Sequence, residues 1–93
     1  MKRLDLIISE KELDPVIEAL DKSSVPGYSV IKHVTGRGEY ASISDGMDFT
    51  GLGANAHIIV FCDQEVLIDL SELVKPILDY YGGVAYISDA NKL

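Results

Sequence analysis

Two stretches of sequence, residues 28–34 (YSVIKHV) and residues 57–62 (HIIVFC), decide the fold of this chain. Both are rich in β-branched and aromatic side chains, which favour strands over helices. Because side chains alternate along a strand, one set from the first stretch is expected on one face of a sheet: Tyr28, Val30, Lys32 and Val34. The second stretch is apolar at consecutive positions, so its strand must place apolar side chains on both faces of the sheet.

The residues before these strands predict a further strand followed by a helix. Residues 4–8 (LDLII) form an apolar run that is too short for a helix. Ser9-Glu10-Lys11-Glu12 then matches a capping box. Apolar residues follow at helical spacing, at Leu13, Val16, Ile17 and Leu20. Since proline is comfortable only in a first turn, Pro15 indicates that the regular helix begins near Asp14.

A second helix is expected after the strand at residues 57–62. It begins at Asp63 or at Ser71, and its apolar stripe is Leu67, Leu70, Leu73, Val74, Ile77 and Leu78. Gly82 and Gly83 end it, because glycine accepts the left-handed conformation that often follows a helix. Residues 84–88 (VAYIS) predict the last strand.

The resulting order is strand, helix, strand, loop, strand, helix, strand, which predicts an α+β fold. It is a ferredoxin-like βαββαβ sandwich, with a four-stranded antiparallel sheet and two helices on one face, in a single domain over residues 1–93. No helix remains to cover the second face of the sheet. Because an exposed apolar face normally marks an interface, the pattern predicts self-association.

Between the two deciding strands, the sequence has neither a helical nor a strand period. Residues 35–54 hold the glycines Gly36, Gly38, Gly46, Gly51 and Gly53. A loop of this length inside a compact domain is uncommon and usually carries function. This segment is therefore the first candidate for a functional role.

Composition and charge exclude several classes of function. The net charge is −7, and all of it falls in residues 39–93, since residues 1–38 carry six basic and six acidic groups. An acidic surface repels a phosphate backbone and argues against nucleic-acid binding. No apolar run approaches the ~18–20 residues of a membrane span, and a single cysteine, Cys62, excludes an internal disulfide. We therefore expect a cytoplasmic protein that does not insert into a membrane.

No arrangement of residues indicates an enzyme. Cys62 ends an apolar strand and has no suitably spaced histidine, so we interpret it as a small buried hydrophobe. His33, His57 and Cys62 lack a recognised metal-binding spacing, so no metal ligand is assigned. Gly36-Arg37-Gly38 is a better candidate, because glycines let backbone N–H groups approach an anion and Arg37 supplies a forked donor suited to phosphate.

Three short motifs on this topology resemble the PII signal-transduction superfamily. Gly27-Tyr28-Ser29-Val30 opens the second strand, Thr35-Gly36-Arg37-Gly38 closes it, and Gly82-Gly83 turns into the last strand. The resemblance covers nearly the whole chain and is closer to the compact PII-like proteins, including those associated with bicarbonate transport or carboxysome gene clusters, than to the nitrogen-regulatory PII proteins. It implies a homotrimer that binds an adenine nucleotide in clefts between subunits. It also implies a mobile T-loop, here about residues 37–53, that signals to a membrane transporter or a metabolic enzyme.

The resemblance further implies which residues contact the nucleotide. Those on the adenine side of the cleft are Gly27, Tyr28 and Ser29. Those at the base of the loop, which face the nucleotide from the neighbouring subunit's side, are Gly36, Arg37 and Gly38. Gly82 and Gly83 match what is left of the family's B-loop, where backbone N–H groups meet phosphate.

Two departures from the family pattern bear on the ligand. Val84 stands where the nitrogen-regulatory members carry a lysine, and Lys92 is the basic residue left near the C-terminus. Each charge-assisted hydrogen bond contributes ~1.5–3 kcal/mol, so the loss of two favours AMP or ADP over ATP. Bicarbonate is a further candidate ligand, and no resident cofactor or metal is expected. The alternative is a CutA-like trimeric structural or metal-tolerance protein that binds no nucleotide.

Overall fold

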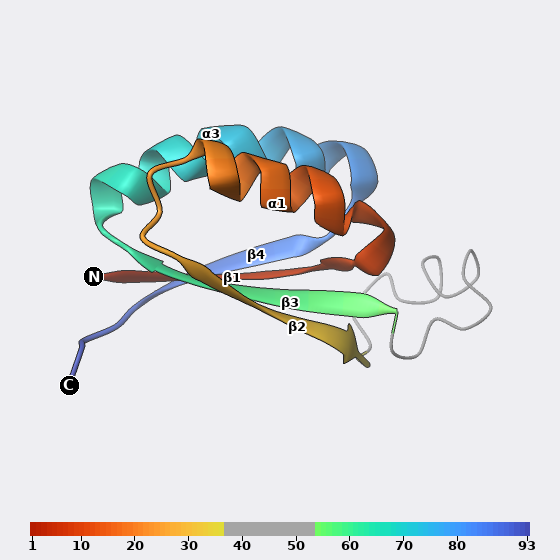
Figure 1. The fold of residues 1–93 in the computed structure, drawn as a ribbon, viewed down its shortest axis with the longest axis horizontal. Coiled ribbons are helices and arrows are strands. Elements are labelled where there is room, and N and C mark those ends of the chain that lie inside the picture. The colour runs from red at the N-terminus through yellow and green to blue at the C-terminus, as the bar shows by residue number, and fades with distance from the viewer. Residues whose placement is uncertain (37–53) are drawn as a thin grey trace.

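A four-stranded antiparallel sheet with two helices on one face makes up the described part of the chain, residues 1–36 and 54–93 of a computed structural model (Figure 1). The elements in order are β1 (Lys2–Ser9), the 3₁₀ helix η1 (Glu10–Glu12), α1 (Leu13–Lys22), β2 (Tyr28–Val34), β3 (Asn55–Cys62), α3 (Gln64–Tyr81) and β4 (Val84–Asp89). The strand order across the sheet is β2-β3-β1-β4. This arrangement confirms the predicted α+β, ferredoxin-like fold.

The core lies between the sheet and the two helices. Along β1 the buried residues are every second one, which shows that one face of the strand packs against the helices. The buried apolar residues are Leu4, Leu6, Ile8, Val16, Ala19, Leu20, Ala56, Ile58, Val60, Cys62, Leu67, Leu70 and Val74. Their alternate neighbours on β1 and β3 lie on the opposite face, which neither helix covers (Figure 1).

The start of the first helix follows the capping signal in the sequence. The Ser9 hydroxyl accepts a hydrogen bond from the Lys11 N–H at 3.3 Å. This cap opens η1, and the regular helix α1 begins at Leu13, which places Pro15 in its first turn. The predicted delay of the regular helix is confirmed.

The second helix, α3, begins directly after Asp63, so the first of the two predicted starting points is correct. Leu67, Leu70 and Val74 are buried, and Ile77 and Leu78 pack against the core. Leu73 was expected in the same stripe, but its side chain is 40% exposed, so that expectation is wrong. Leu73 lies about 100° from Val74 around the helix axis and falls beyond the covered stripe. Among the described residues, neither helix has the length and apolar character that a membrane span requires.

A β-bulge interrupts β2 near its end. Ile31 pairs with His57, whereas Val34 pairs with Asn55, so three steps along β2 correspond to two along β3. His33 lies inside the bulge with φ of 60°, a left-handed conformation that is unusual for a residue other than glycine. The extra residue breaks the alternation of side chains between the two faces of the sheet. Val34 was predicted to share a face with Tyr28 and Val30, but it lies opposite Asn55, so that prediction is wrong. The bulge ends at Val34, two residues before Gly36.

Candidate functional site

The first group of predicted binding residues lies where β2 begins. The Tyr28 hydroxyl donates a hydrogen bond to the Asp21 carboxylate of α1 at 3.0 Å, and this contact raises the pKa of the phenol. Tyr28 pairs with the buried Val60, so it belongs to the helix-covered face, and Ser29 belongs to the uncovered face. Nothing lies within 4 Å of a methyl group placed on Gly27. The backbone at Gly27 is therefore open to a neighbouring molecule.

The remaining predicted residues that the structure describes lie at the opposite end of the strands. Gly36 follows β2, and Gly82 and Gly83 connect α3 to β4. The Gly82 N–H donates to the Leu78 carbonyl at 2.8 Å and caps the helix, so that group is already used within the chain. Two further predicted residues, Arg37 and Gly38, lie outside the described residues, as does the rest of the predicted loop at residues 37–53.

Gly83 is fixed by its surroundings. Its φ is 116°, and a Cβ added there would lie 3.0 Å from the Ile7 carbonyl oxygen and 3.1 Å from the Leu78 side chain. Only glycine fits this close approach of the turn to β1. The turn before β4 is therefore packed closely against β1 and α3.

The strand order places these turns at opposite edges of the sheet. Gly36 follows the edge strand β2, and Gly82-Gly83 precedes the edge strand β4, with β3 and β1 between them. Three strand spacings of about 4.8 Å separate the two edges by about 14 Å. A ligand much smaller than this separation therefore cannot contact both turns of one copy.

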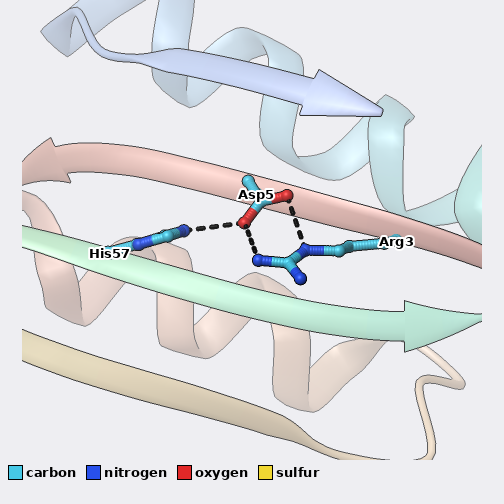
Figure 2. Close-up of polar contacts among 3 residues, drawn as sticks. All are labelled: Arg3, Asp5 and His57. Atoms are coloured by element: carbon cyan, nitrogen blue, oxygen red, sulfur yellow. Dashed lines mark hydrogen bonds and ion pairs between the residues drawn. The ribbon is translucent and has the colours of Figure 1, made fainter. Parts of the chain in front are cut away.

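A polar network lies on the uncovered face of the sheet (Figure 2). Arg3 donates to both carboxylate oxygens of Asp5, from Nε at 2.9 Å and from Nη2 at 3.0 Å. The His57 Nε2 atom lies 2.7 Å from Asp5 Oδ1. The Arg3 guanidinium, helped by His57, holds the pKa of the Asp5 carboxyl below its usual value. Residues from β1 and β3 that lie 52 positions apart in the sequence thus form one network.

Apolar side chains surround this network. The Arg3 guanidinium lies 5.6 Å from the centre of the Phe61 ring, a cation–π distance. Ile31 and Val84 extend the apolar surface on β2 and β4, and their exposed fractions are 48% and 43%. The predicted apolar second face of the sheet is therefore present, but it has a charged centre that the sequence analysis missed. The sequence did contain a signal for this charged centre, because Arg3, Asp5 and His57 interrupt otherwise apolar strands.

Cys62 and the histidines do not converge on one site. Cys62 is buried on the helix-covered face, where burial raises the pKa of its thiol. His57 projects from the other face of the same strand, and the nearest acidic partner of His33 is Glu10, at 3.4 Å. Within residues 1–36 and 54–93, no group of three His, Cys, Asp or Glu side chains is arranged to hold a metal ion.

An open groove of about 460 Å³ lies between α3 and β4. Its apolar lining includes Leu67, Ile68 and Ile87, and Lys2 and Lys75 lie at its sides. Each lysine is close to a carboxylate, Lys2 to Asp89 and Lys75 to Asp79. Because both cations are paired, the groove has no free positive charge to attract an anion.

The fold and these features define a small ferredoxin-like domain with one uncovered sheet face and glycine turns at opposite sheet edges. Residues 1–93 match the family described as Nitrogen regulatory protein P-II, and the chain belongs to that family. No curated protein sequence matches the chain significantly.

Solved structures with the same fold include the nitrogen regulatory PII-like protein CPII from Thiomonas intermedia K12. In its complex with ADP, AMP and bicarbonate, CPII is 22% identical to this chain with a TM-score of 0.75, over 94% of this chain and 82% of CPII. A structure of CPII with ADP and bicarbonate gives 24% identity and a TM-score of 0.75, over the same shares of the two chains. The apo form of CPII gives 22% identity and a TM-score of 0.72, over 94% of this chain and 85% of CPII.

Proposed function

We propose that this chain is the subunit of a homotrimeric PII-like regulator that binds AMP or ADP in preference to ATP, or bicarbonate, in clefts between copies. Residues 37–53 carry the signal to a membrane transporter or a metabolic enzyme in the cytoplasm, and the protein catalyses no reaction. The observation that carries this proposal is the position of Gly36 and Gly82-Gly83 at opposite edges of one sheet. One copy supplies the turn after β2 and the next copy supplies the turn before β4.

Family membership and the ligands of CPII support the choice of ligand. The family is described as regulatory, and CPII has been solved with ADP, AMP and bicarbonate. Val84 follows the glycine turn in place of a cationic residue, which lowers the positive charge available to a third phosphate. A nucleotide with fewer phosphates is therefore the better match.

The distribution of acidic residues supports assembly from identical copies. Among the described strand residues, Asp5 is the acidic residue whose position faces the uncovered side, and Arg3 neutralises it. The other described acidic residues belong to the helices or to the turns beside them, with the exception of Asp89. Asp89 pairs with Lys2 on the helix-covered side of the sheet. Two identical acidic faces would repel each other, so a nearly neutral face on a chain of net charge −7 suits contact with a second copy.

Calorimetric titration with AMP, ADP and ATP, each with and without bicarbonate, tests ligand binding. A methyl group on Gly36 meets no atom within 4 Å in the single chain, so Gly36→Ala should fold normally. In the proposed cleft the same methyl group crowds the ligand, and overpacking of about 1–3 kcal/mol should lower ADP affinity about fivefold or more. Equal thermal stability of the two proteins is the control, and GDP is the control ligand.

Two results would contradict the proposal in different ways. A trimer that gives no heat with any nucleotide or with bicarbonate contradicts the sensor function and favours a structural protein. A monomer in sedimentation at all working concentrations contradicts the composite cleft itself.

A further inference from the structure

The Arg3–Asp5–His57 network contains a titratable group in a partly shielded position. Side-chain exposure is 18% for Asp5 and 25% for His57, and Arg3 is 39% exposed. All three side chains lie on the face that no helix covers (Figure 2). Any copy that covers this face therefore removes the network from water.

The charge of the network depends on the protonation of His57. Arg3 engages both oxygens of Asp5, so this pair is neutral by itself. A neutral imidazole that donates its Nε2 proton to Asp5 keeps the network neutral. A protonated imidazole gives it a charge of +1 with no second carboxylate to offset it. Covering an uncompensated charge is costly, whereas covering the neutral network is much less so.

The groups around His57 follow from the strand register. On the neighbouring strands, the residues opposite His57 are Ile7 of β1 and Ile31 of β2. Beyond β1, the residue of β4 opposite Asp5 is Tyr86. The ionisable groups near His57 are therefore Asp5 and Arg3 of the network and, past the bulge of β2, His33 with its partner Glu10.

We propose that assembly of this chain through its uncovered sheet face requires His57 to be neutral, so that the Arg3–Asp5–His57 network makes assembly dependent on pH. This inference rests on the proposed function, because it concerns the contact between copies that forms the binding clefts. Mild acidity therefore dissociates the assembly, and any binding site shared between two copies is lost with it.

Proton linkage sets the size of the effect. Each imidazole that must give up its proton can lower the association constant at most about tenfold per pH unit, so three imidazoles in a trimer can lower it at most about thousandfold per pH unit. The concentration at which half of the trimer dissociates varies as the inverse square root of that constant. It should therefore rise as the pH falls, by at most about thirtyfold per pH unit.

Sedimentation over a dilution series at about pH 7.5 and about pH 5.5 measures this concentration. His57→Gln keeps an amide N–H that can donate to Asp5 but cannot take up a proton, so its half-dissociation concentration should not change with pH. His33→Asn is the matched control, because it removes the other histidine and asparagine tolerates the left-handed backbone at that position. It should keep the full pH-dependent change of the unmodified chain.

A second measurement covers the case in which His57→Gln fails to fold or to assemble. Dilution calorimetry of the unmodified protein at several pH values between about 5.5 and 7.5, in two buffers of different ionisation enthalpy, should record net proton uptake on dissociation. No pH effect, no proton uptake, or a pH effect that persists in His57→Gln overturns the inference but leaves the assembly intact. A chain that is monomeric at both pH values overturns the proposed assembly, and this inference with it.

Discussion

Arg3 and Asp5 stand two positions apart on β1, and their side chains form a guanidinium–carboxylate pair on the uncovered face. The Arg3 contact is the main reason why the pKa of Asp5 is lowered. A carboxyl whose pKa is lower in the folded state contributes stability above its unfolded pKa, and that contribution is lost as the pH falls through the lowered value. The pair therefore stabilises the fold at neutral pH and stops doing so in acid.

Removal of the guanidinium should raise the pKa of Asp5. In Arg3→Gln the carboxyl keeps its contact with His57 but loses the stronger partner, so the Asp5 carboxyl carbon should titrate at higher pH by NMR. Acid unfolding of this variant should also begin at higher pH. Lys2→Gln is the control, because Lys2 pairs with the exposed Asp89 and should leave the titration of Asp5 unchanged. An unchanged Asp5 titration in Arg3→Gln would show that the guanidinium is not the cause.

A single methyl group at Gly83 should destabilise the fold. It would lie 3.0 Å from the Ile7 carbonyl oxygen on a backbone with φ of 116°. Strain and overpacking of this kind cost about 1–3 kcal/mol, so Gly83→Ala should lower the urea midpoint clearly. Gly36→Ala, whose methyl group meets no atom within 4 Å, should leave the midpoint nearly unchanged. Equal losses for the two variants would contradict the close packing of the turn.

At the scale of elements, α3 shows which part of an apolar stripe is covered. Leu70 is fully buried and Leu73 is 40% exposed, although both are leucines within the same stripe of the sequence. Leu70→Ala should cost about 2–5 kcal/mol in the free energy of unfolding, because it leaves a cavity. Leu73→Ala should cost less than about 1 kcal/mol, as surface substitutions usually do. Similar urea midpoints for the two variants would show that α3 is rotated from this position.

Local patterns predicted the elements well, because each depends on residues close together in the sequence. The period of two along β1, the cap at Ser9 and the glycines after α3 act within a few residues. The same patterns indicated an uncovered sheet face, since the sequence offers only two helices for a four-stranded sheet.

Features that depend on strand register could not be read from local patterns. The bulge at His33 is visible only when Val34 is found opposite Asn55. The contact of Asp5 with His57 requires β1 to lie beside β3 in one particular register. The exposure of Leu73 depends on how α3 is rotated over the sheet, which its apolar stripe does not specify to within one residue. The predicted nucleotide contacts remain predictions, because they need a second copy and a ligand.

At the scale of the whole molecule, the uncovered face should tolerate an added acid poorly. Ile31 is exposed on that face, and Ile68 is similarly exposed on the helix side of the molecule, with fractions of 48% and 53%. Ile31→Glu should convert the assembly to monomers, because each covered face would bury an unpaired charge. Ile68→Glu adds the same charge elsewhere and should leave the sedimentation coefficient unchanged. Loss of assembly in Ile68→Glu alone would show that the copies contact each other through the groove between α3 and β4.

The separation of charge between the two sides of the molecule also bears on how far assembly proceeds. Once the nearly neutral sheet faces are covered, the surface left outside includes the helices, which carry most of the described carboxylates. Completed particles then present like charge to one another in every approach, and this repulsion opposes stacking or further growth. In the proposed assembly, the segregation of charge that lets copies join would also limit further growth, so it favours small closed particles over filaments.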